Sequence, residues 1–242
     1  NKNGNLKRVG DHVKIPGMAE TLKKIAKFGP DIFYKGEIAE KISEDMLTNG
    51  GLLSYSDLSS YVTTRTEPLS SKYRDFEVYT NQPPGGGVML LEMLNVLENF
   101  DLRNMEHNSW EYIRIVSETM KRATLDKEMF VGDPLFVDVP LAKLLSKKYA
   151  LDASNRIKRN ERTFINRVGQ IESKDTTHVS VIDRKGNCVT MTHSLGMPSG
   201  VITDDLGFMF NGCMAVFDPR PGRAGSIVPG KSRFSSLAPT IV

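Results

Sequence analysis

The residues with the clearest potential for chemistry are Asp175-Thr176-Thr177-His178, where helical sequence patterns give way to strand patterns. A threonine at the start of a strand is ordinarily structural, because Thr favours strands. To act as a nucleophile it needs a base that takes its hydroxyl proton. One solution is the threonine's own α-amine, which is freed when the chain is cut just before it. Thr176 is therefore a candidate nucleophile whose activation requires cleavage after Asp175.

Two alternating segments around a turn allow the surroundings of Thr176 to be predicted. His178–Ile182 and Cys188–Ser194 alternate, and Arg184-Lys185-Gly186 suits a three-residue loop closed by a left-handed glycine. A hairpin centred there pairs Asp183 with Asn187, Ile182 with Cys188, Ser180 with Thr190, His178 with Thr192, and Thr176 with Ser194. Because side chains alternate along a strand, the pairs from Ile182–Cys188 to Thr176–Ser194 share one face. The polar row could simply be solvated, or it could place the Ser194 hydroxyl where it holds and tunes the nucleophile.

Other motifs point to simpler interpretations. Gly85-Gly86-Gly87 precedes a helical pattern and could place N–H groups around a phosphate, but a tight strand-to-helix corner is favoured because the P-loop Lys-Ser/Thr is missing. The four histidines lack metal-ligand spacing, so we expect no metal. Cys188 and Cys213 cannot form a disulfide framework and lack CxxC spacing. For His178 and His193 we favour hydrogen-bonding support over general-base work.

Composition excludes several classes of protein. The 242 residues suit one large or two small domains, since domains average roughly 150 residues. With 39% hydrophobic and 25% charged residues, the chain can bury a real core. The net charge of +3 is too small to imply nucleic-acid binding, and the basic cluster between Arg156 and Arg162 is interpreted as a solvated helix face. The longest apolar stretch, Val88–Leu97, is interrupted by polar residues, so we expect no membrane span.

Helical patterns dominate the first 175 residues, and strand patterns follow. The predicted helices are Met18–Phe28, about Gly36–Thr48, a short capped helix at Ser56-Asp57-Leu58, one from the glycine triplet to about Glu98, one from Asn108-Ser109 through Ala123, and Leu141–Ala150. Ala153–Arg167 is charged and expected at the surface. Outside the hairpin, the predicted strands are Phe76–Thr80, Gly207–Phe210 and Pro239–Val242. This order indicates an α+β fold whose sheet is assembled late in the chain.

The ends of the sequence suggest a piece of a longer protein. The chain begins Asn1-Lys2-Asn3-Gly4 without a methionine and stops within a strand-like pattern at Pro239–Val242. Any targeting segment is expected before Asn1, so the sequence assigns no compartment, cytoplasmic or secreted.

Motifs along essentially the whole chain match those of one known family in order and spacing. In the first part they are Phe33-Tyr34-Lys35-Gly36, Gly50-Gly51, Asp57-Leu58, Pro83-Pro84 with Gly86-Gly87, and Gly132-Asp133-Pro134. The most specific are Thr176-Thr177-His178 with the hairpin, Pro229-Gly230-Lys231, Ser235-Ser236 and Pro239-Thr240. In these motifs the sequence resembles the γ-glutamyltranspeptidase family.

The resemblance implies an N-terminal-nucleophile hydrolase with a four-layer α-β-β-α sandwich, present here as an incomplete segment. It implies self-cleavage between Asp175 and Thr176 into two fragments that stay associated as a heterodimer. Residues 1–175 would be the C-terminal part of a mostly helical large-subunit-like region, and residues 176–242 the N-terminal part of a β-rich, catalytic small-subunit-like region. Thr176 would attack a γ-glutamyl (glutathione-type) or similar amide and pass the acyl group to water or an amino acid. Neither a metal nor an organic cofactor is expected.

The resemblance also assigns further site residues. Ser194 matches a family threonine that contacts the nucleophile, and Ser235-Ser236 match a serine pair that binds the substrate's α-carboxylate. By contrast, Gly196 replaces a substrate-contacting Asn, and Cys213 and Val216 replace a Gln and an Asp that grip the α-amine. Losing the acidic partner should weaken ammonium binding by on the order of 1–3 kcal/mol. An acylase with a different acyl pocket is therefore a second hypothesis, and a catalytically silent scaffold that binds peptides is a third. The family's carboxylate-binding arginine and oxyanion-hole glycine pair are expected outside residues 1–242.

Overall fold

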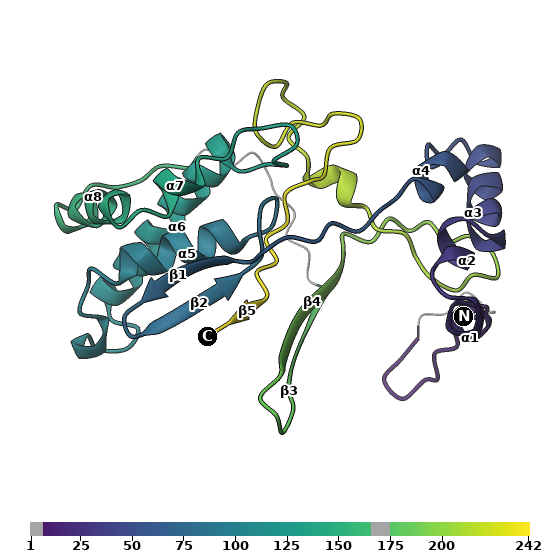
Figure 1. The fold of residues 1–242 in the computed structure, drawn as a ribbon, viewed down its shortest axis with the longest axis horizontal. Helices are drawn as coiled ribbons and strands as arrows, with labels where there is room; N and C mark the ends of the chain where they lie inside the picture. Colours follow the sequence, from purple (N-terminus) through teal and green to yellow (C-terminus); the bar gives the residue numbers. More distant parts are fainter. Residues whose placement is uncertain (1–6, 166–174) are drawn as a thin grey trace. The chain divides into compact units, whose positions relative to one another are not determined.

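The computed structural model describes residues 7–165 and 175–242, which belong to two compact units (Figure 1). Unit 1 comprises Asn1–Thr64 and Pro198–Asn211, and unit 2 comprises Arg65–Met197 and Gly212–Val242. Sequence on both sides of the 175–176 bond therefore contributes to each unit.

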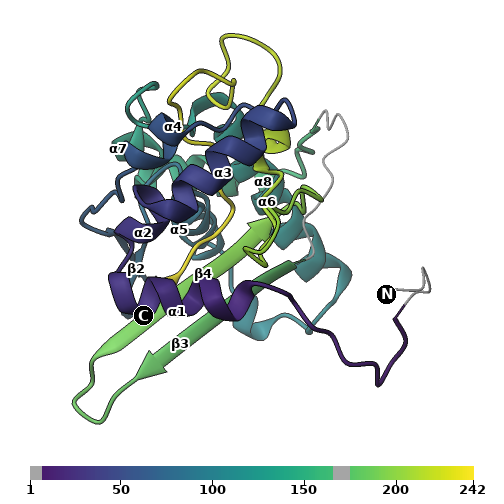
Figure 2. The same ribbon diagram turned by 90° about the vertical axis from the view of Figure 1, so that its right-hand side faces the viewer.

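Unit 1 is a group of helices around a small apolar core. Its helices are α1 (Met18–Phe28), α2 (Asp31–Tyr34), α3 (Glu37–Thr48) and α4 (Tyr55–Ser59), and α2 and α3 lie between α4 and α1 in both views (Figure 1 and Figure 2). The core consists of Ile38, Ala39, Ile42, Leu58 and Leu206. The periodic patterns predicted α1 and α3 correctly, and the side chain of Ser54 caps α4 by accepting a hydrogen bond from the amide of Asp57.

The predicted strand Gly207–Phe210 is wrong. This segment is irregular, and its Phe208 and Phe210 rings pack against the core of unit 1. The Thr21 hydroxyl of α1 donates to the carbonyl of Leu206 at 2.8 Å. At the other end, the backbone of Phe210 bonds to Ser199 and Val201, but this pairing does not extend into a regular strand. A Cβ atom on Gly207 would lie 2.2 Å from the amide nitrogen of Met18, which shows how closely the backbones approach.

Unit 2 contains an antiparallel sheet with helices on one face. The strands are β1 (Leu69–Tyr73), β2 (Phe76–Thr80) and β5 (Thr240–Ile241), in the order β1-β2-β5. The helices are α5 (Gly87–Leu97), α6 (Trp110–Phe130), α7 (Leu141–Leu144) and α8 (Lys147–Lys158), with 3-10 turns η1 (Leu102–Asn104) and η2 (Cys213–Val216). Helix α5 packs on the sheet, and α6 and α8 pack behind it (Figure 1). Among the described residues, none of the helices combines the length and apolarity that crossing a bilayer requires.

The predicted hairpin forms the second sheet, as a two-stranded ribbon of β3 (Asp175–Ile182) and β4 (Cys188–Gly196) (Figure 1). Its register is the predicted one, from the Ile182–Cys188 pair to the Thr176–Ser194 pair. The turn closes as expected, because Gly186 has φ +82° and its N–H donates to the carbonyl of Asp183. Both faces of the ribbon are largely exposed within this chain.

Two predictions about the helices need correction. The single helix expected over Leu141–Ala150 is two helices, because the Ser146 side chain accepts a hydrogen bond from the amide of Tyr149 and begins α8 there. The stretch expected at the surface from Ala153 onwards continues α8 to Lys158, with Ile157 fully buried. The end of that stretch, residues 166–167, lies outside the described residues. Strand β1 was not predicted, since Leu69–Tyr73 lacks a clear alternation of apolar and polar residues.

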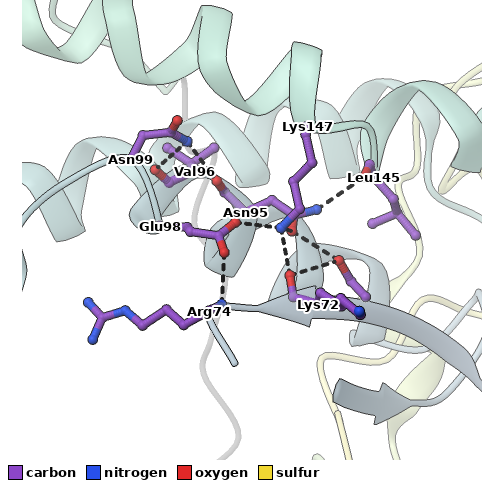
Figure 3. A network of polar contacts seen from close by, with 9 residues as sticks. Lys72, Arg74, Asn95, Val96, Glu98, Asn99, Leu145 and Lys147 are labelled. Atoms are coloured by element: carbon purple, nitrogen blue, oxygen red, sulfur yellow. Dashed lines mark hydrogen bonds and ion pairs between the residues drawn. The ribbon is translucent and has the colours of Figure 1, made fainter. Parts of the chain in front are cut away.

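A buried polar network ties the sheet to the helices (Figure 3). Asn95 of α5 is fully buried; its side chain accepts from the Ser71 hydroxyl of β1 and donates to the carbonyl of Leu145. The ammonium group of Lys147, at the start of α8, donates to Asn95 Oδ1 at 2.8 Å and pairs with Glu98. These bonds satisfy polar groups from three elements at once, so they fix the position of the sheet against α5 and α8.

A second buried polar group of unit 2 is the carboxyl of Glu92, which is 2% exposed on α5. Burial, and then the neighbouring carboxyl of Asp126, raise the pKa of Glu92 to about 9. The Tyr149 hydroxyl donates to both oxygens of Asp126 at 2.9 Å. Glu92 is therefore protonated in the folded protein at neutral pH.

We expect Glu92→Gln to stabilise unit 2 increasingly as pH rises. Between the ordinary carboxyl pKa near 4.5 and the folded value of about 9, the folded state binds more protons than the unfolded state. The contribution of Glu92 to the stability of the unmodified protein must therefore fall with rising pH across this window, by up to about 1.4 kcal/mol per pH unit. Glutamine cannot ionise, so the difference between the variants should grow until about pH 9. Urea denaturation at a series of pH values measures it, and the exposed Glu111→Gln is the control. Parallel stability profiles for Glu92→Gln and the unmodified protein would contradict the assignment.

Candidate active site

Thr176 lies at the open end of the hairpin, opposite Ser194. Their hydroxyl oxygens are 3.0 Å apart, and Thr176 is exposed. The register shifts by one between Asp175 and Thr176, because Asp175 pairs with Gly196 and leaves Leu195 as an extra residue. Such bulges kink the local backbone and are common beside active sites. The irregularity coincides with the peptide bond at which cleavage is predicted.

The Ser194 hydroxyl is held by the backbone that follows it. The N–H of Gly196 donates to Ser194 Oγ at 2.9 Å. Since that oxygen already accepts one hydrogen bond, its own proton can point to Thr176 Oγ1. Ser194 can therefore act as the donor in the contact between the two hydroxyls.

His178 belongs to the same polar face but contacts other hydroxyls. Its Nδ1 lies 2.8 Å from Thr192 Oγ1, and its Nε2 lies 3.1 Å from Ser180 Oγ and 3.2 Å from Thr190 Oγ1. With both ring nitrogens engaged, His178 rigidifies the ribbon, as the sequence-based preference for hydrogen-bonding support predicts. His193 pairs with Thr177 and so lies on the opposite face from Thr176.

Gly196 and Cys213, two positions where the sequence departs from the resembled family, are in contact. Cys213 is 8% exposed, and its thiol lies 3.6 Å from the carbonyl oxygen of Leu195. A Cβ atom on Gly196 would lie only 2.2 Å from the Cys213 sulfur. The Gly196 backbone has φ +69°, a region that glycine and, less readily, asparagine adopt. The backbone conformation alone would admit asparagine there, but the thiol fills the space.

The Ser235-Ser236 pair is held by the glycine corner that precedes α5. Ser235 N donates to the carbonyl of Pro84 at 2.8 Å, and Gly86 N donates to the carbonyl of Leu237 at 3.0 Å. A Cβ atom on Gly86 would lie 2.6 Å from the Ser236 carbonyl oxygen. The corner interpretation of the three glycines is therefore confirmed.

A phosphate site at the glycine triplet is excluded by its hydrogen bonds. The N–H of Gly85 donates to the carbonyl of Gln82 at 2.9 Å, and that of Gly87 donates to Asn81 Oδ1 at 3.1 Å. Together with the bond of Gly86, all three glycine N–H groups are occupied within the chain. No donor of the triplet remains for an anion.

Two supporting residues had no role assigned from sequence. Asn81 joins the corner to the C-terminal segment, because its Nδ2 donates to the carbonyl of Leu237 at 3.0 Å. Asp133 is buried and accepts from the amides of Ser232 at 2.7 Å and Leu135 at 3.0 Å, which anchors the loop before the serine pair. The motif Gly132-Asp133-Pro134 was the only signal for the second of these, and the partner, about 100 residues away, is invisible in sequence.

The predicted site residues thus fall into two groups. Contacts join Thr176, Ser194, Gly196 and Cys213 to one another, while the glycine corner holds Ser235-Ser236. Val216, at the end of η2, presents an aliphatic side chain that cannot pair with an ammonium group. Within the described parts of the chain, no three His, Cys, Asp or Glu side chains gather as a metal site would require.

Sequence comparison identifies the family of the chain. The sequence profile of the family described as gamma-glutamyltranspeptidase matches residues 1–242. The chain is 36% identical over its full length to the glutathione hydrolase proenzyme of Escherichia coli (strain K12), of which it covers 45%. Over 91% of its length it is 37% identical to the acylase ACY 1 proenzyme of Pseudomonas sp. (strain SE83), of which it covers 40%. The chain therefore spans less than half the length of these relatives.

Solved structures show the same fold. The cephalosporin acylase from Bacillus halodurans superposes with a TM-score of 0.83 and 28% identity over 99% of this chain and 44% of that one. The gamma-glutamyltranspeptidase of Helicobacter pylori gives 0.55 and 37% identity over 57% of this chain and 40% of that one. These likenesses confirm the expected α+β, N-terminal-nucleophile hydrolase fold.

Gly86→Ala should destabilise unit 2 and displace the serine pair. The added methyl group would meet a backbone carbonyl rather than a flexible side chain, which costs about 1–3 kcal/mol. Gly225→Ala is the matched control, because its Cβ would make an ordinary contact, 3.8 Å from Asp218 Cβ. Urea denaturation of both variants measures the difference. Equal stabilities of the Gly86→Ala and Gly225→Ala variants would show that the backbone at the glycine corner can shift at little energetic cost.

Proposed function

Because the chain belongs to the gamma-glutamyltranspeptidase family, we propose that it carries the nucleophile, Thr176, of a self-processed amidohydrolase or acyltransferase. The observation that carries the proposal is the 3.0 Å contact between the Thr176 and Ser194 hydroxyls at the bulged end of the hairpin. A threonine with only a solvated, structural role would not require the Ser194 hydroxyl, which the N–H of Gly196 holds in place beside it.

The first proposed step is self-cleavage. Thr176 Oγ1 attacks the carbonyl carbon of Asp175; the C–N bond breaks, an ester forms, and the hydroxyl proton passes to the released nitrogen. Water then hydrolyses the ester, which leaves a carboxylate on Asp175 and a free α-amine and hydroxyl on Thr176. The two fragments, 1–175 and 176–242, are proposed to stay together as a heterodimer. Two observations support this. Each unit contains residues of both fragments, and β5 of the smaller fragment pairs with β2 of the larger one.

In the cleaved protein, the α-amine of Thr176 accepts the hydroxyl proton while Oγ1 attacks the acyl carbon of the substrate. Ser194 donates a hydrogen bond to Oγ1, without giving up its proton, and so stabilises the negative charge that develops there. The leaving amine takes a proton from the α-ammonium. The resulting acyl-enzyme transfers its acyl group to water or to an amino acid.

Glutathione-type γ-glutamyl amides are the first proposed substrate class, since similar proteins are named glutathione hydrolase proenzymes. An N-acyl amide acylase with a different acyl pocket is the second candidate. A specific observation favours it: Cys213 and Val216 present neutral groups, and neither can pair with the α-ammonium of a γ-glutamyl group. Hydrolysis of glutathione, compared with that of a panel of N-acyl amides lacking the α-amine, distinguishes the two candidates.

Thr176→Ala should leave the polypeptide uncut. The variant lacks the hydroxyl that attacks the carbonyl of Asp175, so denaturing electrophoresis should show one band where the unmodified protein shows two. Mass spectrometry should find Thr176 at the new N-terminus of the smaller fragment. Thr176→Ser keeps a hydroxyl and should still divide. If the unmodified protein stays uncut, only the hypothesis of a catalytically silent scaffold remains. If the Thr176→Ala variant is cut at this bond, an outside protease is responsible.

Ser194→Ala should lower kcat by about tenfold to a hundredfold, because a hydrogen bond to developing charge is lost. Ser194→Thr retains a hydroxyl and should keep most of the activity. Ser180→Ala, which removes a hydroxyl from the same face without a contact to Thr176, is the matched control. Steady-state kinetics on the cleaved proteins measures the effect. Equal kcat values for Ser194→Ala and Ser180→Ala would remove Ser194 from the mechanism.

A further inference from the structure

We propose that Cys213 is a positioning residue for the nucleophile, acting through a chain of hydrogen bonds that ends on Thr176 Oγ1. The inference rests on the proposed function of Thr176. It gives the buried thiol, at a position where the resembled family has a Gln that grips the substrate, a task that needs no contact with substrate.

The thiol holds one end of a peptide group whose other end holds Ser194. Cys213 Sγ donates to the carbonyl oxygen of Leu195 at 3.6 Å, and the N–H of Gly196 donates to Ser194 Oγ at 2.9 Å. This carbonyl and this N–H belong to the same planar, trans peptide unit, so they point in opposite directions. The two hydrogen bonds therefore fix the orientation of the peptide plane from both sides.

All the donors of this chain point towards the nucleophile. The thiol donates to the Leu195 carbonyl, the amide of the same peptide donates to Ser194 Oγ, and the Ser194 hydroxyl donates to Thr176 Oγ1, 3.0 Å away. Hydrogen bonds in such a series polarise one another, because each group that accepts a bond becomes a better donor. The thiol therefore strengthens the donor that stabilises negative charge on Oγ1.

The peptide between Leu195 and Gly196 needs such a constraint because glycine permits it to rotate. Gly196 has φ +69° and no Cβ that would restrict the preceding peptide group, and Leu195, the extra residue of the bulge, has no pairing partner in β3. If the plane turned over, a carbonyl oxygen would replace the N–H beside Ser194 Oγ. The Ser194 proton would then turn to that oxygen and away from Thr176.

The turn that carries Cys213 is itself tied to the bulge. Gly212 N donates to the carbonyl of Met197 at 2.5 Å, and Cys213 begins η2 directly after it. The sulfur packs so closely on Gly196 that a Cβ atom there would lie 2.2 Å from it. Contacts with three consecutive residues of β4 and its end hold the thiol against the carbonyl. A buried thiol so enclosed suits a fixed donor better than a reactive group.

Cys213→Ala should lower kcat about threefold to tenfold and leave KM unchanged, because one hydrogen bond of the chain is lost. Cys213→Ser keeps a donor and should give a kcat between those of the unmodified protein and Cys213→Ala. Cys188→Ala, at the exposed first residue of β4, is the matched control and should not alter kcat. The substrate is γ-glutamyl 4-nitroanilide, or pentanoyl 4-nitroanilide if the unmodified protein cleaves only that one. Equal kcat values for Cys213→Ala and the unmodified protein would overturn the proposal.

A double-mutant cycle with Ser194→Ala separates this role from a structural one. If Cys213 acts through the Ser194 hydroxyl, Cys213→Ala should change kcat by no more than about twofold in the Ser194→Ala protein. Equal reductions of kcat in both backgrounds would show that a cavity or a shifted turn causes the loss, and would refute the role in positioning.

Amide hydrogen exchange tests the proposal without turnover and so separates it from the proposed function. In the Cys213→Ala protein, the N–H of Gly196 should exchange about threefold to tenfold faster, while the amides between Cys188 and Thr192 keep their exchange rates. An unchanged exchange rate at Gly196 would contradict the proposal. If the unmodified protein cleaves neither itself nor either anilide, the proposed function fails, and the exchange rate still decides whether Cys213 orients the peptide.

Discussion

The antiparallel register of β3 and β4 is the constraint on which the candidate site depends. A slip by one residue would move Thr176 to the opposite face of the ribbon, away from Ser194. The left-handed Gly186 fixes that register at one end, and the bulge at Leu195 redirects the backbone at the other. The bulge also brings the N–H of Gly196 back to the Ser194 hydroxyl. One backbone irregularity thus orients Ser194, the partner of the candidate nucleophile.

The serine pair depends on a different kind of contact, the close approach of two backbones. Glycine at position 86 lets the segment around Ser236 pass where any side chain would collide with a carbonyl. Asn81 then donates to the carbonyl of Leu237, and Asp133 accepts from the amide of Ser232. Such bonds stabilise a surface segment without regular secondary structure, because each buried polar group finds a partner. The pairing of β2 with β5 continues the same connection to the sheet.

Helix α5 links these features to the rest of unit 2. Its first turn follows the glycine corner, and its buried polar residues Asn95 and Glu92 face the sheet and the other helices. Asn95 shares its hydrogen bonds between Ser71 of β1, Lys147 at the start of α8 and the carbonyl of Leu145. A helix with such partners on every side has little freedom to shift, so the corner that holds the serine pair is anchored to the core.

Much of this arrangement follows from the sequence by itself. Apolar periodicity and the glycines that follow define α1 and α3, and the Ser109 cap begins α6. The turn chemistry around Gly186 determines the register that pairs Thr176 with Ser194. These are local properties, because they depend on residues a few positions apart. The same local reasoning misassigns Gly207–Phe210, whose aromatic residues pack into a helical core, and runs α7 into α8.

Only the tertiary structure decides which distant residues meet. The contacts of Asn81 with Leu237, of Asp133 with Ser232, and of Gly196 with Cys213 join positions separated by 17 to 156 residues. No pattern within a short window contains that information, since loop geometry and backbone packing set these distances. The sequence therefore determines the local backbone geometry around Thr176, the candidate nucleophile, while the folded chain determines which distant side chains surround it.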